Sequence, residues 1–131
     1  MASVAPGQAY VTVPYILTGG SATDVYIFGT NGETQGGNLV GVLVTDSTGA
    51  VLTAATVALR QGGVNYVLAS TGFALPSATE NLEIVCEPAI RCKRGDSIRV
   101  TGANGHHVFV TYVPIGLDTG EQAQTLPGRK G

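Results

Sequence analysis

The sequence lacks the features that mark several common classes of protein. It has no tryptophan, and aromatic residues make up only 6% of its 131 residues. Sugar-binding modules usually present a row of exposed aromatic side chains, so few residues could build such a surface here. Charged residues are also scarce, at 12%, and the formal net charge is −2. This balance does not suit a protein that wraps nucleic acid.

Long hydrophobic runs are absent as well. No stretch approaches the ~18–20 apolar residues that a membrane helix needs. The N-terminus, MASVAPGQAY, has neither a basic region nor a long apolar run, so it does not read as a signal peptide. We therefore expect synthesis in the cytoplasm, no membrane partner, and release by another route if the protein acts outside the cell.

The chain has only two cysteines, Cys86 and Cys92. A structural zinc site needs four ligands. His106 and His107 complete that number by count alone, because adjacent residues on a strand point to opposite faces. A disulfide is geometrically possible but disfavoured in a reducing cytoplasm. We expect two buried thiols that behave as small apolar residues, and no metal or other cofactor.

Recognisable catalytic groupings are missing too. Glu80 and Glu83 are three residues apart, which on a strand places them on opposite faces, so they do not form a glycosidase pair. The sequence has no G-x-S-x-G and no P-loop. The glycine-rich run at 29–38 lacks the lysine and the following helix that phosphate binding requires. We expect no catalytic residues and no enzyme activity.

What the sequence does contain is alternation of apolar and polar residues, many valines and 19 glycines. These are typical of β-strands separated by turns, and the length suits one domain. We predict an all-β fold, an antiparallel β-sandwich of jelly-roll-like form with about eight strands. The expected strands cover residues 11–15, 24–28, 39–45, 50–60, 65–70, 81–87, 97–101 and 106–115, and Ile90 and Cys92 continue as a short inward pair after Pro88.

Two details of this prediction concern connections. The run DSTG at 46–49 predicts a turn, so that 39–45 and 50–60 form a hairpin. The run GTNGETQGGN at 29–38 has no apolar anchor and predicts an exposed, mobile loop.

Polar tails flank the expected sandwich. We divide the chain into an N-terminal arm at 1–8, a β-sandwich domain at 9–115 and a C-terminal arm at 116–131. Neither arm has enough apolar surface to fold alone, so each is either disordered or ordered against a neighbour. The partner-contact residues expected in and beside them are Val4, Pro6, Tyr10, Leu117, Leu126 and Pro127.

Tyr26 and Phe28 are the best candidates for an exposed aromatic surface. They fall on the strand face opposite Val25 and Ile27, which we expect to point inward. A carbohydrate- or receptor-binding module would use such a pair. The alternative is that both rings pack against a neighbouring strand or subunit.

The stretch AIRCKRGDSIRVTG at 89–102 holds most of the positive charge and the tripeptide Arg94-Gly95-Asp96. As a nucleic-acid site this basic cluster is small and has no neighbouring aromatics for stacking. The tripeptide is known as a cell-adhesion signal, but it also suits a tight turn. Gly95 can adopt positive φ, and Asp96 can accept from backbone N–H groups just after it. We predict a turn before a core strand.

Residues 81–113 resemble a segment that recurs in small β-sandwich domains of tailed-phage virions. The matching pieces, in order, are Leu82 and Ile84, then Ile90 and Cys92, then Gly95-Asp96, Ile98 and Val100, Asn104-Gly105, and finally Val108, Val110 and Tyr112. Cys86 and Cys92 stand where aliphatic residues are usual, and residues 1–70 match only in rhythm.

The resemblance implies a virion structural protein. The first expectation is a phage capsid decoration, or cement, protein that binds the major capsid protein and stabilises the shell. The close alternative is a head-fibre, spike-base, neck or tail component. The expected location is the virion, and a homo-oligomer, favoured as a trimer, would match the local threefold axes of a capsid.

Overall fold

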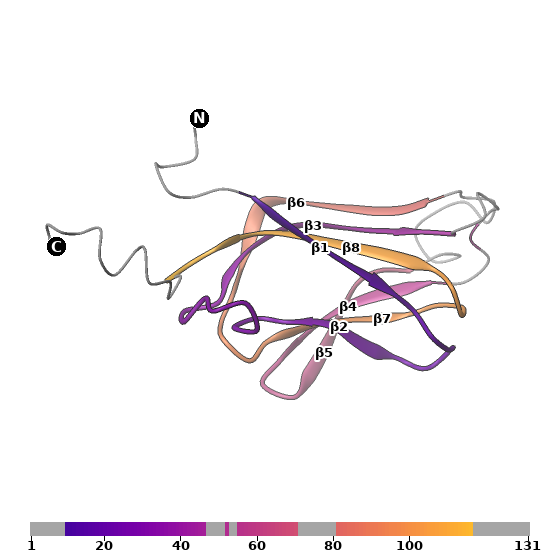
Figure 1. Ribbon diagram of the computed structural model, residues 1–131, viewed down its shortest axis with the longest axis horizontal. Coiled ribbons are helices and arrows are strands. Elements are labelled where there is room, and N and C mark those ends of the chain that lie inside the picture. Colours follow the sequence, from indigo (N-terminus) through magenta and orange to yellow (C-terminus); the bar gives the residue numbers. More distant parts are fainter. Residues whose placement is uncertain (1–9, 47–51, 53–54, 71–80, 117–131) are drawn as a thin grey trace, which may run out of the picture.

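The computed structural model describes residues 10–46, 52, 55–70 and 81–116, and these form two antiparallel sheets of four strands each (Figure 1). We call β1-β8-β3-β6 the first sheet and β2-β7-β4-β5 the second sheet. The strands are β1 (Val11–Ile16), β2 (Thr23–Ile27), β3 (Gly37–Thr45), β4 (Thr56–Gln61), β5 (Val64–Ser70), β6 (Asn81–Cys92), β7 (Ser97–Thr101) and β8 (His107–Pro114). The predicted all-β sandwich with eight strands is confirmed.

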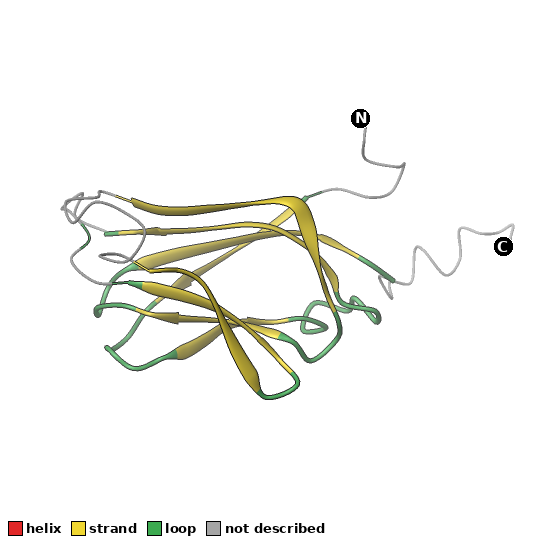
Figure 2. Ribbon diagram, turned by 180° about the vertical axis from the view of Figure 1, so that it is seen from behind, coloured by secondary structure: helices red, strands yellow, loops and turns green. Residues whose placement is uncertain are grey.

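The connections give the sandwich its jelly-roll order. Of the consecutive strand pairs, β4 and β5 are hydrogen-bonded neighbours, whereas every other connection carries the chain from one sheet to the other (Figure 2). The predicted hairpin between 39–45 and 50–60 is therefore wrong. β3 pairs with β6 and β8 in the first sheet, while β4 pairs with β5 and β7 in the second. Turn residues in a sequence indicate where the chain changes direction, but they do not determine whether the two strands on either side pair with each other. Here those two strands belong to different sheets.

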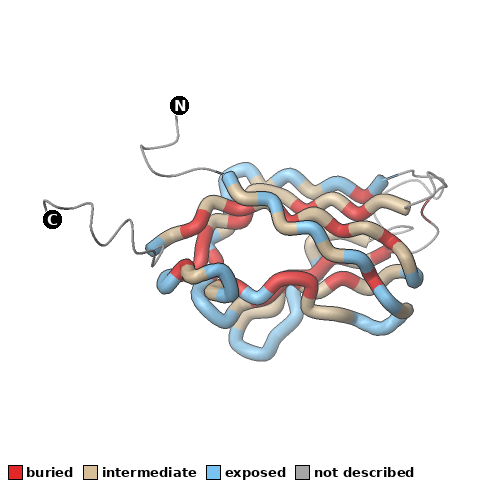
Figure 3. The backbone as a smooth tube through the Cα atoms, in the orientation of Figure 1, coloured by how far each residue is buried: buried red, intermediate tan, exposed pale blue. Residues whose placement is uncertain are grey.

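The C-terminal half follows the predicted alternation closely. Leu82 is fully buried on β6, and that strand continues past the cis bond before Pro88 to the buried Cys92. β7 has the predicted bounds, with Ile98 and Val100 inside. Along β8, buried residues alternate with partly exposed ones, as the alternating colours of the tube in Figure 3 show.

A β-bulge in β2 overturns the prediction for Tyr26 and Phe28. The register with β7 shifts between Asp24 and Tyr26, which leaves Val25 as an extra residue. The alternation reverses after it, so Tyr26 and Phe28 point into the core at 5% and 1% exposure, and Ile27 points outward at 45%. The two rings pack at right angles, with their centroids 5.3 Å apart. The prediction of an exposed aromatic surface is wrong. The alternative, that both rings pack against neighbouring strands, is confirmed.

The prediction of an exposed, mobile loop at 29–38 is also wrong in part. Its last two residues open β3, and Glu33 in its middle is completely buried. Gly36 must approach the chain at 92–94 closely, because a Cβ at Gly36 would lie 2.1 Å from the carbonyl oxygen of Cys92. The loop is anchored by a buried polar side chain in place of an apolar one.

Most of the expected arm residues lie outside the described part of the chain. Val4, Pro6, Leu117, Leu126 and Pro127 belong to this group, as do residues 47–49 of the predicted turn. Tyr10 is described and lies just before β1, with 58% of its surface exposed. The carbonyl oxygen of Gly116 accepts hydrogen bonds from the N–H and the hydroxyl of Thr34, which ties the first residue of the expected C-terminal arm to the domain.

Candidate functional site

The outer face of the first sheet carries few charged side chains and several exposed apolar ones. Its strand register aligns three rows across β1, β8, β3 and β6. Apart from Glu83 and His107, each row consists of apolar, glycine, threonine or asparagine residues. The rows are Pro14–Phe109–Leu43–Glu83, Thr12–Thr111–Gly41–Val85 and Ile16–His107–Thr45–Asn81. We call these rows the apolar face.

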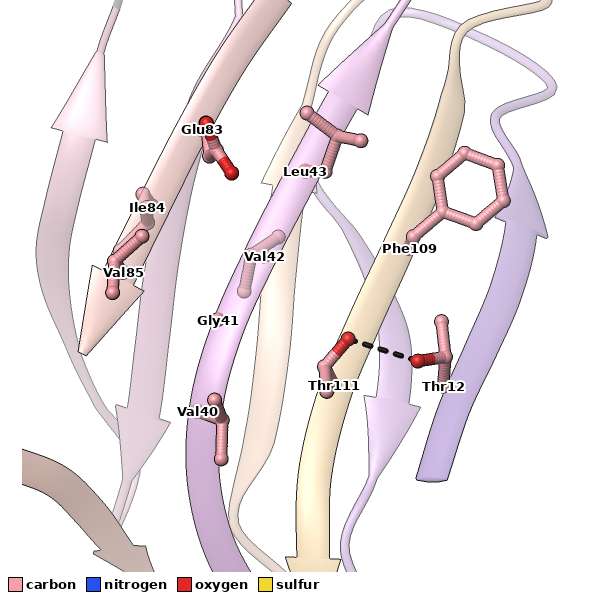
Figure 4. Close-up of a pocket in the computed structure, with 10 residues that line it drawn as sticks. All are labelled: Thr12, Val40, Gly41, Val42, Leu43, Glu83, Ile84, Val85, Phe109 and Thr111. Atoms are coloured by element: carbon pink, nitrogen blue, oxygen red, sulfur yellow. Dashed lines mark hydrogen bonds between the residues drawn. The ribbon is translucent and has the colours of Figure 1, made fainter. Parts of the chain in front are cut away.

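A shallow hollow of about 470 Å³ lies in the middle of the apolar face (Figure 4). Gly41 forms its floor, and the side chains of Leu43, Val85 and Phe109 stand around it. Only glycine fits at this position, because a Cβ there would lie 2.7 Å from the carbonyl oxygen of Ile84. The hollow thus follows from the close approach of β3 and β6 beside the bulge between Leu39 and Gly41.

The outer face of the second sheet is different in kind. Asp24 and Arg99, opposite each other on β2 and β7, form an ion pair with 3.0 Å between Oδ1 and Nε. On the next strands, Arg60 donates a hydrogen bond of 3.0 Å to the side-chain oxygen of Asn65. A sandwich in water normally solvates the outer faces of its sheets with polar residues. The outer side of the second sheet combines these charged and polar pairs with the exposed Ile27 and Val67, whereas the three rows of the first sheet carry only Glu83 and His107 as ionisable side chains and surround a hollow. We therefore take the apolar face as the candidate contact surface.

Inside the domain, Glu33 joins the 29–36 loop to both sheets. Its Oε1 accepts hydrogen bonds from the Tyr26 hydroxyl at 2.7 Å, the Gly29 N–H at 2.7 Å and the Asn31 N–H at 3.1 Å. Its Oε2 accepts one from the Tyr112 hydroxyl at 2.6 Å. The two tyrosine hydroxyls also lie within hydrogen-bond distance of each other, at 2.7 Å.

These contacts fix the charge state of the buried cluster. Burial alone would raise the pKa of Glu33, but the hydrogen bonds from Tyr112, Tyr26 and the two N–H groups outweigh it and hold that pKa below its ordinary 4.5. Burial and the hydrogen bonds to Glu33 raise the pKa of both Tyr26 and Tyr112 above their ordinary value. The cluster is therefore a carboxylate held by two neutral phenols, and each of its hydroxyls is engaged internally.

The tripeptide Arg94-Gly95-Asp96 forms the predicted turn. Gly95 has φ +97°, and its N–H donates to the carbonyl of Phe28, while the Phe28 N–H donates to the carbonyl of Asp96. The Asp96 carboxylate accepts from the Lys93 N–H at 2.8 Å and from the Gln61 side chain at 3.0 Å. It thus caps a residue before it, not after it as predicted. Both hydrogen bonds end on Oδ2, so the aspartate is part of the turn.

The residues considered for metal binding are not brought together. Among the residues that the structure describes, no group of three or more histidine, cysteine or acidic side chains could hold a metal ion. His106 is buried and accepts the Ala103 N–H at its Nδ1, whereas His107 lies on the apolar face beside Phe109. Both cysteines are free thiols, and burial raises the pKa of Cys92 to about 12.

Neither the apolar face nor the Glu33 cluster has a direct signature in the sequence. Alternation predicts only that Phe109, Thr111 and Thr12 lie on the strand face opposite the core, and Glu33 lies in a glycine-rich run that predicts an exposed loop. The signal that could have found the face is the scarcity of charged residues at these outward positions. In the described part of the chain, no helix is long and apolar enough to cross a membrane. No protein-family model matches the chain, and no curated protein is significantly similar to it.

Proposed function

We propose that this chain is a non-enzymatic structural protein of a phage virion, a decoration protein that binds the outside of the capsid shell and stabilises it. The observation that carries the proposal is the apolar face, a nearly uncharged sheet surface with a hollow at its centre. A second support is the resemblance of residues 81–113 to virion β-sandwich domains.

The chemistry of the apolar face suits attachment to a protein surface. Val85 and Ile16 are 67% and 56% exposed, so docking would remove their apolar surface from water. Each Å² of apolar surface that is buried contributes about 25 cal/mol. The threonine pair Thr12 and Thr111, joined by a 3.0 Å hydrogen bond between their hydroxyls, supplies polar contacts within the same surface. The partner we assign is the major capsid protein.

The test is the number of copies in intact particles of the virus that encodes the chain. Quantitative mass spectrometry should find this protein in a stoichiometric ratio to the major capsid protein. Adding purified protein to expanded shells that lack it should raise their melting temperature. A few copies per particle would instead identify the alternative, a fibre, spike-base, neck or tail component, and absence from purified particles would refute both.

A further inference from the structure

β5 is the open edge of the second sheet, and it lacks the features that normally keep an edge from pairing. Its seven residues, Val64–Ser70, contain no charged residue and no proline. Exposed edge strands usually carry charges, prolines or bulges that prevent pairing with another chain. One bulge is present, between the pairs at Val57 and Ala58, but residues 64–67 lie beyond it and are all exposed.

The other three sheet edges each carry such a feature. β1 contains Pro14, which has no N–H to donate. β2 is five residues long, bears Asp24 and is interrupted by its bulge. β6 contains Pro88 and three charged residues, Glu83, Glu87 and Arg91. β5 is thus the edge among the described strands that remains able to accept another strand.

The side chains of β5 point to the same conclusion. Tyr66 is paired with the buried Leu59 of β4, so it projects from the core side of the sheet, yet it is 52% exposed. Val67 projects from the opposite side and is 58% exposed. The β4–β5 hairpin extends beyond the rest of the domain in both ribbon views (Figures 1 and 2), which leaves both of its faces uncovered there.

We propose that β5 pairs with β5 of a second copy of this chain, antiparallel and about a twofold axis. In such a dimer each residue of β5 lies opposite or near a β5 residue of the second copy. A charged residue on β5 would then lie close to the same charge on the partner, which is destabilising. Val64–Ser70 carries none, and the nearest cation, Arg60, is already bonded to Asn65. The two four-stranded second sheets would join into one continuous sheet, and the exposed Tyr66 and Val67 side chains of the two copies would cover each other.

This pairing has twofold symmetry, so it favours a dimer over the trimer that capsid symmetry suggested. It uses the second sheet, whereas the proposed capsid contact uses the first. The dimer therefore leaves the apolar face free to bind a capsid. The β5 pairing and the proposed capsid contact can be tested, and refuted, independently.

The experiment is analytical ultracentrifugation of the full chain over a concentration series. We expect a dimer for the wild type, and we expect Val67→Lys, which sets two like charges in the interface, to weaken dimerisation by about a hundredfold. Ile27→Lys on the edge strand β2 is the matched control, and it should remain dimeric. A wild type that stays monomeric, or a Val67→Lys dimer as tight as the wild type, would overturn the proposal.

Hydrogen exchange of the unmodified protein gives a second reading that needs no variant. Amide protection in residues 64–70 should rise with protein concentration, while protection in β1 and β2 should stay constant. Protection of β5 that does not change with concentration would contradict the pairing. If Val67→Lys is monomeric but still binds capsids, the proposed function stands without the dimer. If a variant of the apolar face loses capsid binding but remains dimeric, the pairing of β5 stands without the proposed function.

Discussion

Replacing Glu33 by alanine should cost the domain a large part of its stability. The change removes the acceptor for four hydrogen bonds, from Tyr26, Gly29, Asn31 and Tyr112. The two hydroxyls keep each other as partners, but the two backbone N–H groups lose theirs. The expected loss is about 3–5 kcal/mol of a total of roughly 5–15 kcal/mol. The melting temperature should fall by about 10–20 °C.

Thermal and urea unfolding, followed by circular dichroism, measure this effect. Glu33→Gln, which keeps one acceptor oxygen, should lose only about 1–2 kcal/mol. Glu83→Ala is the matched control, because Glu83 is exposed on β6, and it should change stability by less than about 0.5 kcal/mol. If Glu33→Ala is as stable as the Glu83→Ala control, the cluster does not hold the loop and the reasoning is refuted.

The Glu33 cluster also sets a pH dependence. The folded pKa of Glu33 lies below its ordinary 4.5, so its contribution is complete above that value and is lost as the pH falls through the folded pKa. The free energy of unfolding should fall less steeply with decreasing pH in Glu33→Gln than in the wild type. Equal slopes in the two proteins would argue against a lowered pKa of Glu33. The folded pKa of Tyr26 is raised, so its contribution is present below its ordinary 10.0 and is lost as the pH rises above that. In urea titrations at high pH, the free energy of unfolding should fall less steeply with rising pH for Tyr26→Phe than for the wild type. Gly41→Ala should destabilise by about 1–3 kcal/mol because its Cβ meets a carbonyl at 2.7 Å, whereas Gly19→Ala, with open space around it, should not. Cys92 should react with a thiol reagent only on unfolding, since burial raises its pKa to about 12; rapid labelling of the native protein would contradict its position in the core.

The fold class and most strands could be predicted because alternation is a local property. Ser97–Thr101 was predicted residue by residue, since Ile98 and Val100 face a core while Arg99 and Thr101 do not. The error at Tyr26 and Phe28 arose because a single bulged residue reverses the alternation after it. The sequence around Val25 carries no glycine or proline that would announce such a bulge.

Pairing between strands was harder to predict than the strands themselves. The turn signal at 46–49 predicts that the two strands beside it pair with each other, but β3 and β4 belong to different sheets. Sheet membership depends on contacts across the whole chain, such as those of β3 with β8. Glu33 was missed for the same reason, because its partners Tyr26 and Tyr112 lie 7 and 79 residues away.

Binding of purified protein to capsids that lack it tests the central claim most directly. Co-sedimentation should show saturable binding for the wild type and for Thr101→Lys, whose change lies on the outer side of the second sheet. Val85→Lys, at the edge of the hollow, should bind at least about tenfold more weakly while remaining folded. Equal binding by Val85→Lys and Thr101→Lys, or no binding by the wild type, would contradict the assignment of the apolar face as the capsid contact.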